Sequence, residues 1–281
     1  MVSSGNYIGY AVDVPYTDQN LDHFWRSADV VHLHHDLVAA RRLTGNWKRW
    51  RLPPKPYIVE FHGTGFREDP RWHLAEMREY GALGLASTLD LYLLAPDELE
   101  WLPAPIDVEA LSAMKQPATD RILIAHAPTN RQIKSTALFL EAVERLQAEG
   151  FPVDLDLIER VPWSECLARK AKADIYFDQV ILGYGCNALE AWGMGIPVVA
   201  GAADDTLDEM ERRFGHLPFY HATAETIYEA LRELVEDPAL RAEYGRIGHD
   251  YVRKYHDEPV VVKQLKGIYQ RALGQSMEDA A

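Results

Sequence analysis

The sequence predicts an α/β protein of two domains, each built around a parallel β-sheet. Short apolar runs, typical of buried strands, alternate along the chain with longer segments of helical periodicity. This alternation is typical of strand–helix–strand units in a parallel sheet. A proline-rich stretch at residues 101–107 interrupts the pattern, which then starts again. We therefore expect one domain at residues 1–105 and a second at residues 106–281.

In the first domain, three apolar runs bounded by polar residues or proline predict strands at residues 28–33, 56–61 and 89–94. Segments of helical character lie between these runs, at residues 38–42 and 71–80. The first domain is therefore expected to repeat the strand–helix unit.

The second domain shows the same alternation more clearly. Strands are predicted at residues 121–125, 153–158, 173–177 and 196–200. Helices are predicted at residues 136–149, 224–236, 238–255 and 259–273. The last of these helices is expected to pack back on the first domain.

Composition excludes several classes of protein. With 47% hydrophobic residues among 281, the chain can form two cores, so disorder is not expected. The net charge of −14 argues against nucleic acid as a partner. Cys166 and Cys186 form neither a disulfide framework nor a zinc-type pair. Since the sequence has no leader-like start and no run of about 18 apolar residues, we expect a cytoplasmic protein without a membrane span.

The most informative stretch is residues 183–200, which predicts a glycine turn, a short helix and a buried strand. A helix that opens at Gly185 and Cys186 presents backbone N–H groups and a partial positive charge, which suit a diphosphate. Glu190 lies about one turn into this helix, where its carboxylate can accept hydrogen bonds from a pair of sugar hydroxyls. The stretch therefore predicts a phosphate and ribose site.

Residues 189–198, Leu-Glu-Ala-Trp-Gly-Met-Gly-Ile-Pro-Val, resemble the signature of GT-B glycosyltransferases. The resemblance is to the large retaining family (family 4, group 1 type) whose motif is Glu, seven residues, Glu. It implies two Rossmann-like domains whose parallel sheets face each other across a cleft, with the donor bound between them. Glu190 corresponds to the second Glu, which binds ribose. The first, sugar-facing Glu is replaced by Leu182.

Other segments extend the resemblance. Residues 102–107 are similar to the family's Pro-Asn-Pro-Val-Asp linker, and residues 237–241 look like the start of its C-terminal helices. Residues 28–34 look like its Asp-Val-Val-His-x-His strand, and residues 61–67 look like its His-Gly loop. Because relatives have a longer segment before the linker, the N-terminal domain is predicted to be shortened on the acceptor side.

The resemblance also implies residues that bind the donor diphosphate. Lys134 matches the family's Lys-Gly, with Ser135 in place of the glycine. Arg131 is expected to assist, because a planar guanidinium suits phosphate. The alternative for both residues is an ordinary exposed side chain.

His62 and Arg67 are the candidate sugar-side residues of the first domain. His62 directly follows a predicted strand, and ligands of parallel sheets bind at the carboxyl ends of strands. The corresponding His of the family faces the donor sugar, and Arg67 belongs to the same loop. A histidine that merely stabilises its loop is the alternative reading.

Three further residues follow strands of the second domain. Val161 lies where relatives hold the nucleobase with backbone groups, and Trp163 either stacks on the base or packs under its loop. Asp178 comes directly after a buried strand and can supply the polar contact that Leu182 lacks. We therefore include Asp178, with His62, as a candidate catalytic residue.

No metal site and no cofactor are predicted. His34 and His35 are adjacent, so on a strand they point to opposite sides. Asp154 and Asp156 superficially match an Asp-x-Asp metal motif but lie on one face of an alternating strand. GT-B enzymes generally need no metal ion, which agrees with this reading.

The chain is therefore predicted to be a metal-independent glycosyltransferase of hexosyltransferase type. It would move a sugar from a nucleotide sugar, with UDP- or GDP-linked donors favoured, to an acceptor hydroxyl that a macromolecule could carry. A non-catalytic or partner-dependent nucleotide-sugar-binding protein is the alternative, in which a second copy or another chain completes the first domain. A remote alternative is an NAD-dependent enzyme, because Gly183-x-Gly185-x-x-Ala188 fits the loose dinucleotide fingerprint.

Overall fold

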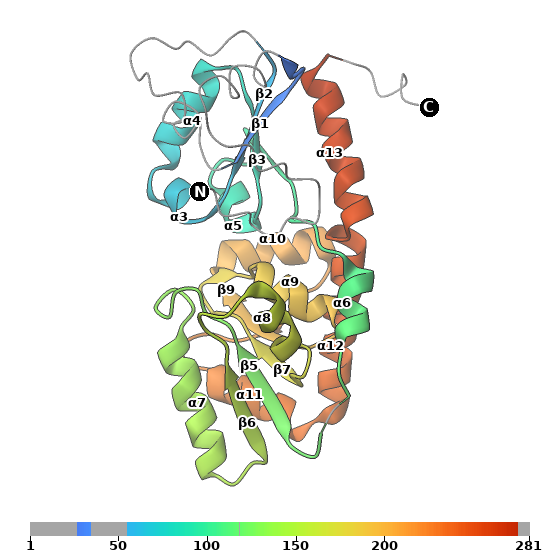
Figure 1. The fold of residues 1–281 in the computed structure, drawn as a ribbon. Coiled ribbons are helices and arrows are strands. Elements are labelled where there is room, and N and C mark those ends of the chain that lie inside the picture. The colour runs from blue at the N-terminus through green and yellow to red at the C-terminus, as the bar shows by residue number, and fades with distance from the viewer. Residues whose placement is uncertain (1–26, 35–54, 118, 275–281) are drawn as a thin grey trace. The chain divides into compact units, whose positions relative to one another are not determined.

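The computed structural model describes residues 27–34, 55–117 and 119–274, and the predicted helix at 38–42 lies outside them. The chain divides into two compact units (Figure 1). Unit 1 comprises residues 1–103 and 261–281, and unit 2 comprises residues 104–260. None of the helices in the described ranges combines the length and the hydropathy that crossing a bilayer requires.

Unit 1 contains a four-stranded parallel sheet with its strands in chain order. The strands are β1 (Val31–His34), β2 (Tyr57–Phe61), β3 (Leu83–Ala86) and β4 (Leu99–Trp101). The helices that follow β2 and β3 are α3 (Gly63–Glu68), α4 (Pro70–Glu79) and α5 (Leu89–Leu93). They supply Phe66, Met77 and Leu91 to a core on one face of the sheet.

The other face of this sheet is covered by α13 (Glu258–Ala272), which contributes Val261 and Ile268 (Figure 1). These side chains pack against Ile58 of β2 and Leu85 of β3. The last helix of the chain is thus part of the core of unit 1.

The predicted strand at residues 89–94 is wrong, because these residues form α5. The strand of this region is instead β3, whose sequence Leu-Gly-Leu-Ala is short and contains a glycine, so its β signal is weak. Packing explains the glycine, since a Cβ on Gly84 would lie 2.4 Å from Met77 Sδ and 2.5 Å from Leu99 Cδ2. The alternation in 89–94 is equally satisfied by a short helix that buries Leu89 and Leu91.

Unit 2 contains a second parallel sheet with strand order β10-β9-β7-β5-β6. Its strands are β5 (Ile122–His126), β6 (Val153–Leu157), β7 (Ile175–Phe177), β9 (Val198–Ala202) and β10 (Tyr220–His221). A two-residue strand, β8 (Leu182–Gly183), pairs antiparallel with β9. The four strands predicted for this domain are confirmed, with ends that shift by one or two residues.

The helices of unit 2 are α6 (Val108–Met114), α7 (Thr136–Ala148), α8 (Trp163–Lys170), α9 (Cys186–Gly193), α10 (Asp204–Phe214), α11 (Ile227–Glu236) and α12 (Pro238–Tyr255). Among them, α6, α8 and α10 were not predicted. Helices α7 and α11 bury Phe139 and Leu231 in the main core against Phe177. Helix α12 approaches α9 so closely that a Cβ on Gly248 would lie 2.0 Å from Trp192 Cδ1.

Two buried histidines of unit 2 make its stability sensitive to pH. Burial lowers the pKa of His126 and of His256 to about 4, from an ordinary value of 6.5. Below pH 6.5 the unfolded chain binds protons that these folded imidazoles do not, so the free energy of unfolding falls as pH drops from 6.5 to 4. We expect each histidine to lower the free energy of unfolding by about 2 kcal/mol when the pH falls from 7.5 to 5. Urea unfolding across this range would measure the slope, and His256→Asn should reduce it by about half.

Candidate functional site

The candidate site of unit 2 lies at the carboxyl ends of its parallel strands. Strands β6 and β7 flank β5 on opposite sides, so the chain changes direction across the sheet at β5. Ligands of open parallel sheets bind at such a switch point. The loops after β5 and β6 and the start of α9 supply the side chains described below.

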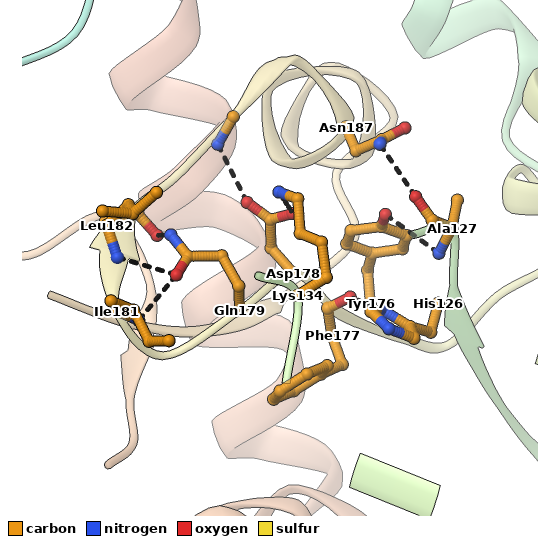
Figure 2. A network of polar contacts seen from close by, with 12 residues as sticks. His126, Ala127, Lys134, Tyr176, Phe177, Asp178, Gln179, Ile181, Leu182 and Asn187 are labelled. Atoms are coloured by element: carbon orange, nitrogen blue, oxygen red, sulfur yellow. Dashed lines mark hydrogen bonds and ion pairs between the residues drawn. The ribbon is translucent and has the colours of Figure 1, made fainter. Parts of the chain in front are cut away.

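A short ion pair links the loop after β5 to the end of β7 (Figure 2). Lys134 Nζ lies 2.5 Å from Asp178 Oδ1, and the Gly185 N–H donates to Asp178 Oδ2 at 2.8 Å. The Asp178 side chain is only 1% exposed, whereas that of Lys134 is 15% exposed. The buried carboxylate therefore holds both the ammonium group and the glycine turn that precedes α9.

Gly185 leaves room for this ion pair. A Cβ at this position would lie 3.3 Å from Lys134 Nζ and 3.8 Å from Asp178 Oδ2. The Gly185 N–H is bound to Asp178, and the Ala188 N–H donates to the Gly185 carbonyl at 2.9 Å. The N–H groups at Cys186 and Asn187, in the first turn of α9, are those that could bind an anion. The ammonium group of Lys134 and the start of α9 thus form one positively polarised edge.

Strained backbone marks the two loops that border the site. Among the described residues, Ser135 and Arg160 are the two non-glycine residues with positive φ, at 50° and 55°. Such a conformation costs roughly 1–2 kcal/mol for a residue with a Cβ. Ser135 follows Lys134 directly, and its φ lies in the left-handed region that favours glycine.

Glu190 is held by a second buried ion pair. Lys170 Nζ lies 2.5 Å from Glu190 Oε2, and the Trp163 indole N–H donates to Glu190 Oε1 at 2.8 Å. The Lys170 side chain is fully buried, and Glu190 is 9% exposed. Lys170 also donates to the backbone and side-chain oxygens of Asn187. The Glu190 carboxylate is therefore fixed in orientation while keeping lone pairs for further donors.

Asn187 connects this network to the loop after β5. Its amide donates to the Ala127 carbonyl at 3.0 Å, and the Ala127 N–H donates to the Tyr176 hydroxyl at 3.3 Å (Figure 2). His126 Nδ1 lies 2.9 Å from the Phe177 carbonyl, so β5, β7 and α9 are joined by side-chain hydrogen bonds.

A pocket of about 990 Å³ opens beside these groups within unit 2. It is lined by residues of the β5 and β6 loops and by the starts of α8 and α9: Ala127, Pro128, Thr129, Arg131, Leu157, Ile158, Glu159, Arg160, Val161, Trp163, Cys166 and Asn187. Its volume is at the upper end of the range for small-molecule sites. The pocket offers cationic, aromatic and backbone groups to one ligand.

Arg131 is engaged at the edge of this pocket. Its guanidinium makes two hydrogen bonds to Glu159, at 2.8 and 2.6 Å, and its side chain is 58% exposed. Arg131 thus lies at the edge of the pocket, paired with a carboxylate that a phosphate would have to displace.

Leu182, which stands where the motif that the sequence resembles has its first Glu, lies in the two-residue strand β8. The Gln179 amide orders this segment, since its Oε1 accepts from the N–H groups of Ile181 and Leu182. Its Nε2 donates to the Gly183 carbonyl (Figure 2). The dinucleotide fingerprint at Gly183 also lacks its expected context, because β8 is antiparallel and is not a parallel strand that feeds a helix.

The two candidates of the first domain lie in unit 1. His62 directly precedes α3, and its Nε2 is 3.0 Å from His34 Nδ1 and 3.6 Å from Glu60 Oε1. Arg67 Nε donates to Asp90 Oδ2 at 2.6 Å. His62 therefore belongs to a histidine–carboxylate cluster, and Arg67 is paired within its own unit.

Several of the predicted residues of unit 2 meet in the structure. Lys134, Asp178 and Gly185 are in direct contact, and Arg131 and Val161 line one pocket. The sequence did not reveal Lys170, because a lysine near the end of a helix usually reaches solvent. Asp154 is paired with Arg121, and Asp156 is paired with Arg169.

No family model matches the sequence, and no curated protein matches it either. Solved structures do resemble it. A glycosyltransferase from Rickettsia africae is 14% identical, with a TM-score of 0.67, covering 96% of this chain and 85% of that one. HepE from Anabaena, in complex with UDP-glucose, is 12% identical with a TM-score of 0.66, covering 90% and 81%. Sucrose-phosphate synthase from Thermosynechococcus elongatus is 13% identical with a TM-score of 0.59, covering 92% and 79%.

At these identities the likeness concerns the fold. The similar structures are GT-B glycosyltransferases that match nearly the whole chain, and both sheets of this protein are parallel apart from β8. The chain therefore has the GT-B fold, as its sequence predicted.

Proposed function

We propose that the chain is a glycosyltransferase that moves a sugar from a nucleoside-diphosphate sugar to an acceptor hydroxyl. The observation that carries this proposal is the polarised edge formed by Lys134 and the start of α9, anchored by the buried Asp178. Structural neighbours that bind UDP or UDP-glucose share the fold, which supports a nucleotide-sugar donor.

In this proposal the donor diphosphate lies against Lys134, Arg131 and the N–H groups at Cys186. These groups stabilise the negative charge that develops on the departing nucleoside diphosphate, and Lys134 is already in place because Asp178 fixes it. Asp178 therefore acts by positioning Lys134. No metal ion takes part in the transfer.

The nucleoside half of the donor occupies the pocket. Glu190 accepts hydrogen bonds from the ribose hydroxyls with the lone pairs that Lys170 and Trp163 leave available. The base lies along the Val161 backbone and against the half-exposed Trp163 ring. His62 and Arg67 of unit 1 are proposed, on the family resemblance, to contact the sugar.

Calorimetric titration with UDP, GDP, ADP and NAD tests the donor site. We expect one nucleoside diphosphate to bind at 1:1 stoichiometry. Glu190→Gln should lower its affinity by roughly 10-fold or more, because hydrogen bonds to a charged acceptor are lost. Glu225→Gln, on an exposed loop of the same unit, is the matched control and should leave binding unchanged. Silence with all three diphosphates, or a preference for NAD, would refute the proposal.

The position of Leu182 favours a second candidate, a protein that binds a nucleotide sugar without transferring it. Both candidates predict nucleotide binding, so turnover separates them. Release of free sugar or transfer to an acceptor supports the transferase, whereas tight binding with an intact donor after prolonged incubation supports the binding protein.

A further inference from the structure

Three histidines and a glutamate gather at the carboxyl ends of β1 and β2 in unit 1. His32 and His34 are two residues apart on β1, so their side chains lie on one face of the sheet. The parallel register pairs His34 with Glu60 of β2, which places the carboxylate on the same face. Glu60 Oε2 lies 3.4 Å from both His32 Nε2 and His34 Nδ1. The cluster is thus a consequence of sheet register.

The hydrogen bonds of His32 leave one ring nitrogen directed at the carboxylate. Nδ1 lies 3.0 Å from the Tyr269 hydroxyl of α13. Nε2 is buried and makes no hydrogen bond to any described residue, since its 3.4 Å contact with Glu60 is too long for a well-formed one. In the tautomer whose Nδ1–H donates to the Tyr269 hydroxyl, Nε2 carries a lone pair. This lone pair faces Glu60 Oε2, which also carries lone pairs. A cation between them would satisfy both atoms.

Glu60 is a buried carboxylate that faces three imidazoles. The residue is only 7% exposed, and its oxygens lie 3.4 Å from His32 Nε2 and His34 Nδ1 and 3.6 Å from His62 Nε2. Imidazole nitrogens and a carboxylate oxygen are ligands that zinc binds in proteins.

The spacing of the polar atoms fits tetrahedral coordination. Nitrogen and oxygen ligands lie about 2.0–2.2 Å from zinc, which places neighbouring ligand atoms about 3.3–3.6 Å apart in a tetrahedron. The two separations to Glu60 Oε2, both 3.4 Å, fall in this range. The ligand atoms of His32, His34 and Glu60 all lie within 4.8 Å of one another, so small side-chain rotations would complete the tetrahedral spacing.

We propose that His32 Nε2, His34 Nδ1 and the Glu60 carboxylate bind one divalent cation of the zinc type. Two imidazoles and one carboxylate suit a borderline cation better than Mg²⁺ or Ca²⁺, which prefer oxygen ligands. His62 Nε2, 3.0 Å from His34 Nδ1, adjoins the set, so cation binding displaces the proton that the two rings share. Among the histidines of this region, the sequence analysis weighed the His34–His35 pair, whereas the spacing that matters is His32-x-His34.

The site would link α13 to the sheet of unit 1. Tyr269 lies on α13 and fixes the His32 ring through Nδ1, the kind of partner that orients metal-ligating histidines. The bound cation stabilises this packing. Because the inference rests on contacts within unit 1, it stands independently of the proposed function.

Metal titration of the full chain tests the site. The protein, without a polyhistidine tag, is treated with a chelator and titrated calorimetrically with Zn²⁺, and Co²⁺ is added in parallel to record the visible absorption of a tetrahedral complex. We expect one saturable site, proton release on binding, no competition by excess Mg²⁺, and a higher thermal midpoint with Zn²⁺.

Four variants locate the binding. His34→Gln and Glu60→Gln should each lower Zn²⁺ affinity by about 100-fold or more, and Tyr269→Phe by about 10-fold through loss of ring orientation. His216→Gln, which alters an exposed histidine of unit 2, is the control and should bind as the unaltered chain does. If Glu60→Gln does not fold, His34→Gln decides, because its side chain is 48% exposed. Unsaturable binding, or equal affinity in His34→Gln, would overturn the proposal.

Discussion

Lys134→Ala is expected to lower kcat/KM for donor turnover by about two to three orders of magnitude, the usual cost of removing one preorganised group that stabilises developing charge. Lys134 is the cation that the buried Asp178 holds at the start of α9, so no other side chain of this edge replaces it. Initial rates with the donor that calorimetry identifies would measure the loss. Donor turnover undiminished in Lys134→Ala would exclude this role.

Two controls separate charge from folding in this experiment. Lys172→Ala removes an exposed lysine from the same unit and should leave the rate unchanged. Asp178→Asn keeps the shape of the side chain but weakens the hold on Lys134, so it should reduce the rate while the ammonium group remains. Circular dichroism of each variant shows whether the fold is retained.

Lys170→Met is expected to lower the free energy of unfolding by about 3–5 kcal/mol, because it leaves the buried Glu190 carboxylate without its cation. Lys170 is fully buried and also binds both oxygens of Asn187, so the variant loses three contacts at once. The Trp163 indole would be the one donor left on Glu190 within this network. Urea denaturation would measure the change.

A double-mutant cycle isolates the ion pair from its surroundings. Adding Glu190→Gln to Lys170→Met removes the uncompensated charge, so the double variant should recover part of the lost stability. Lys170→Met and the double variant should both bind the nucleoside diphosphate weakly, because each loses the contact that orients the side chain of residue 190. Strict additivity of the two single effects would show that Lys170 and Glu190 are not coupled.

Local signals in the sequence were sufficient for most elements of the fold. The helix at 136–149 has a clear apolar stripe, and the strand at 56–61 is a short run that begins at a proline and is apolar apart from Glu60, so each has one natural assignment. The strand prediction for residues 89–94 was wrong because the pattern of so short a run is compatible with either a strand or a short helix. Tertiary packing made the choice, since β3 already fills that place in the sheet.

In the candidate site, too, some residues could be predicted from local sequence signals and others could not. The glycine turn and helix at residues 183–193 could be identified from their order in the chain, and Lys134 from its motif. Lys170 and His32 could not, because a lysine near a helix end and a histidine on a strand are usually ordinary residues. Their roles depend on partners that local periodicity does not specify.

The sequence by itself determined a parallel α/β chain with the GT-B signature, because hydrophobic periodicity and glycine turns are encoded within short segments. Only the tertiary structure decided which side chains meet. Lys134 and Asp178 are 44 residues apart, Lys170 and Glu190 are 20 apart, and His34 and Glu60 lie on different strands. These contacts depend on strand order and register, which are set by the packing of whole elements against one another.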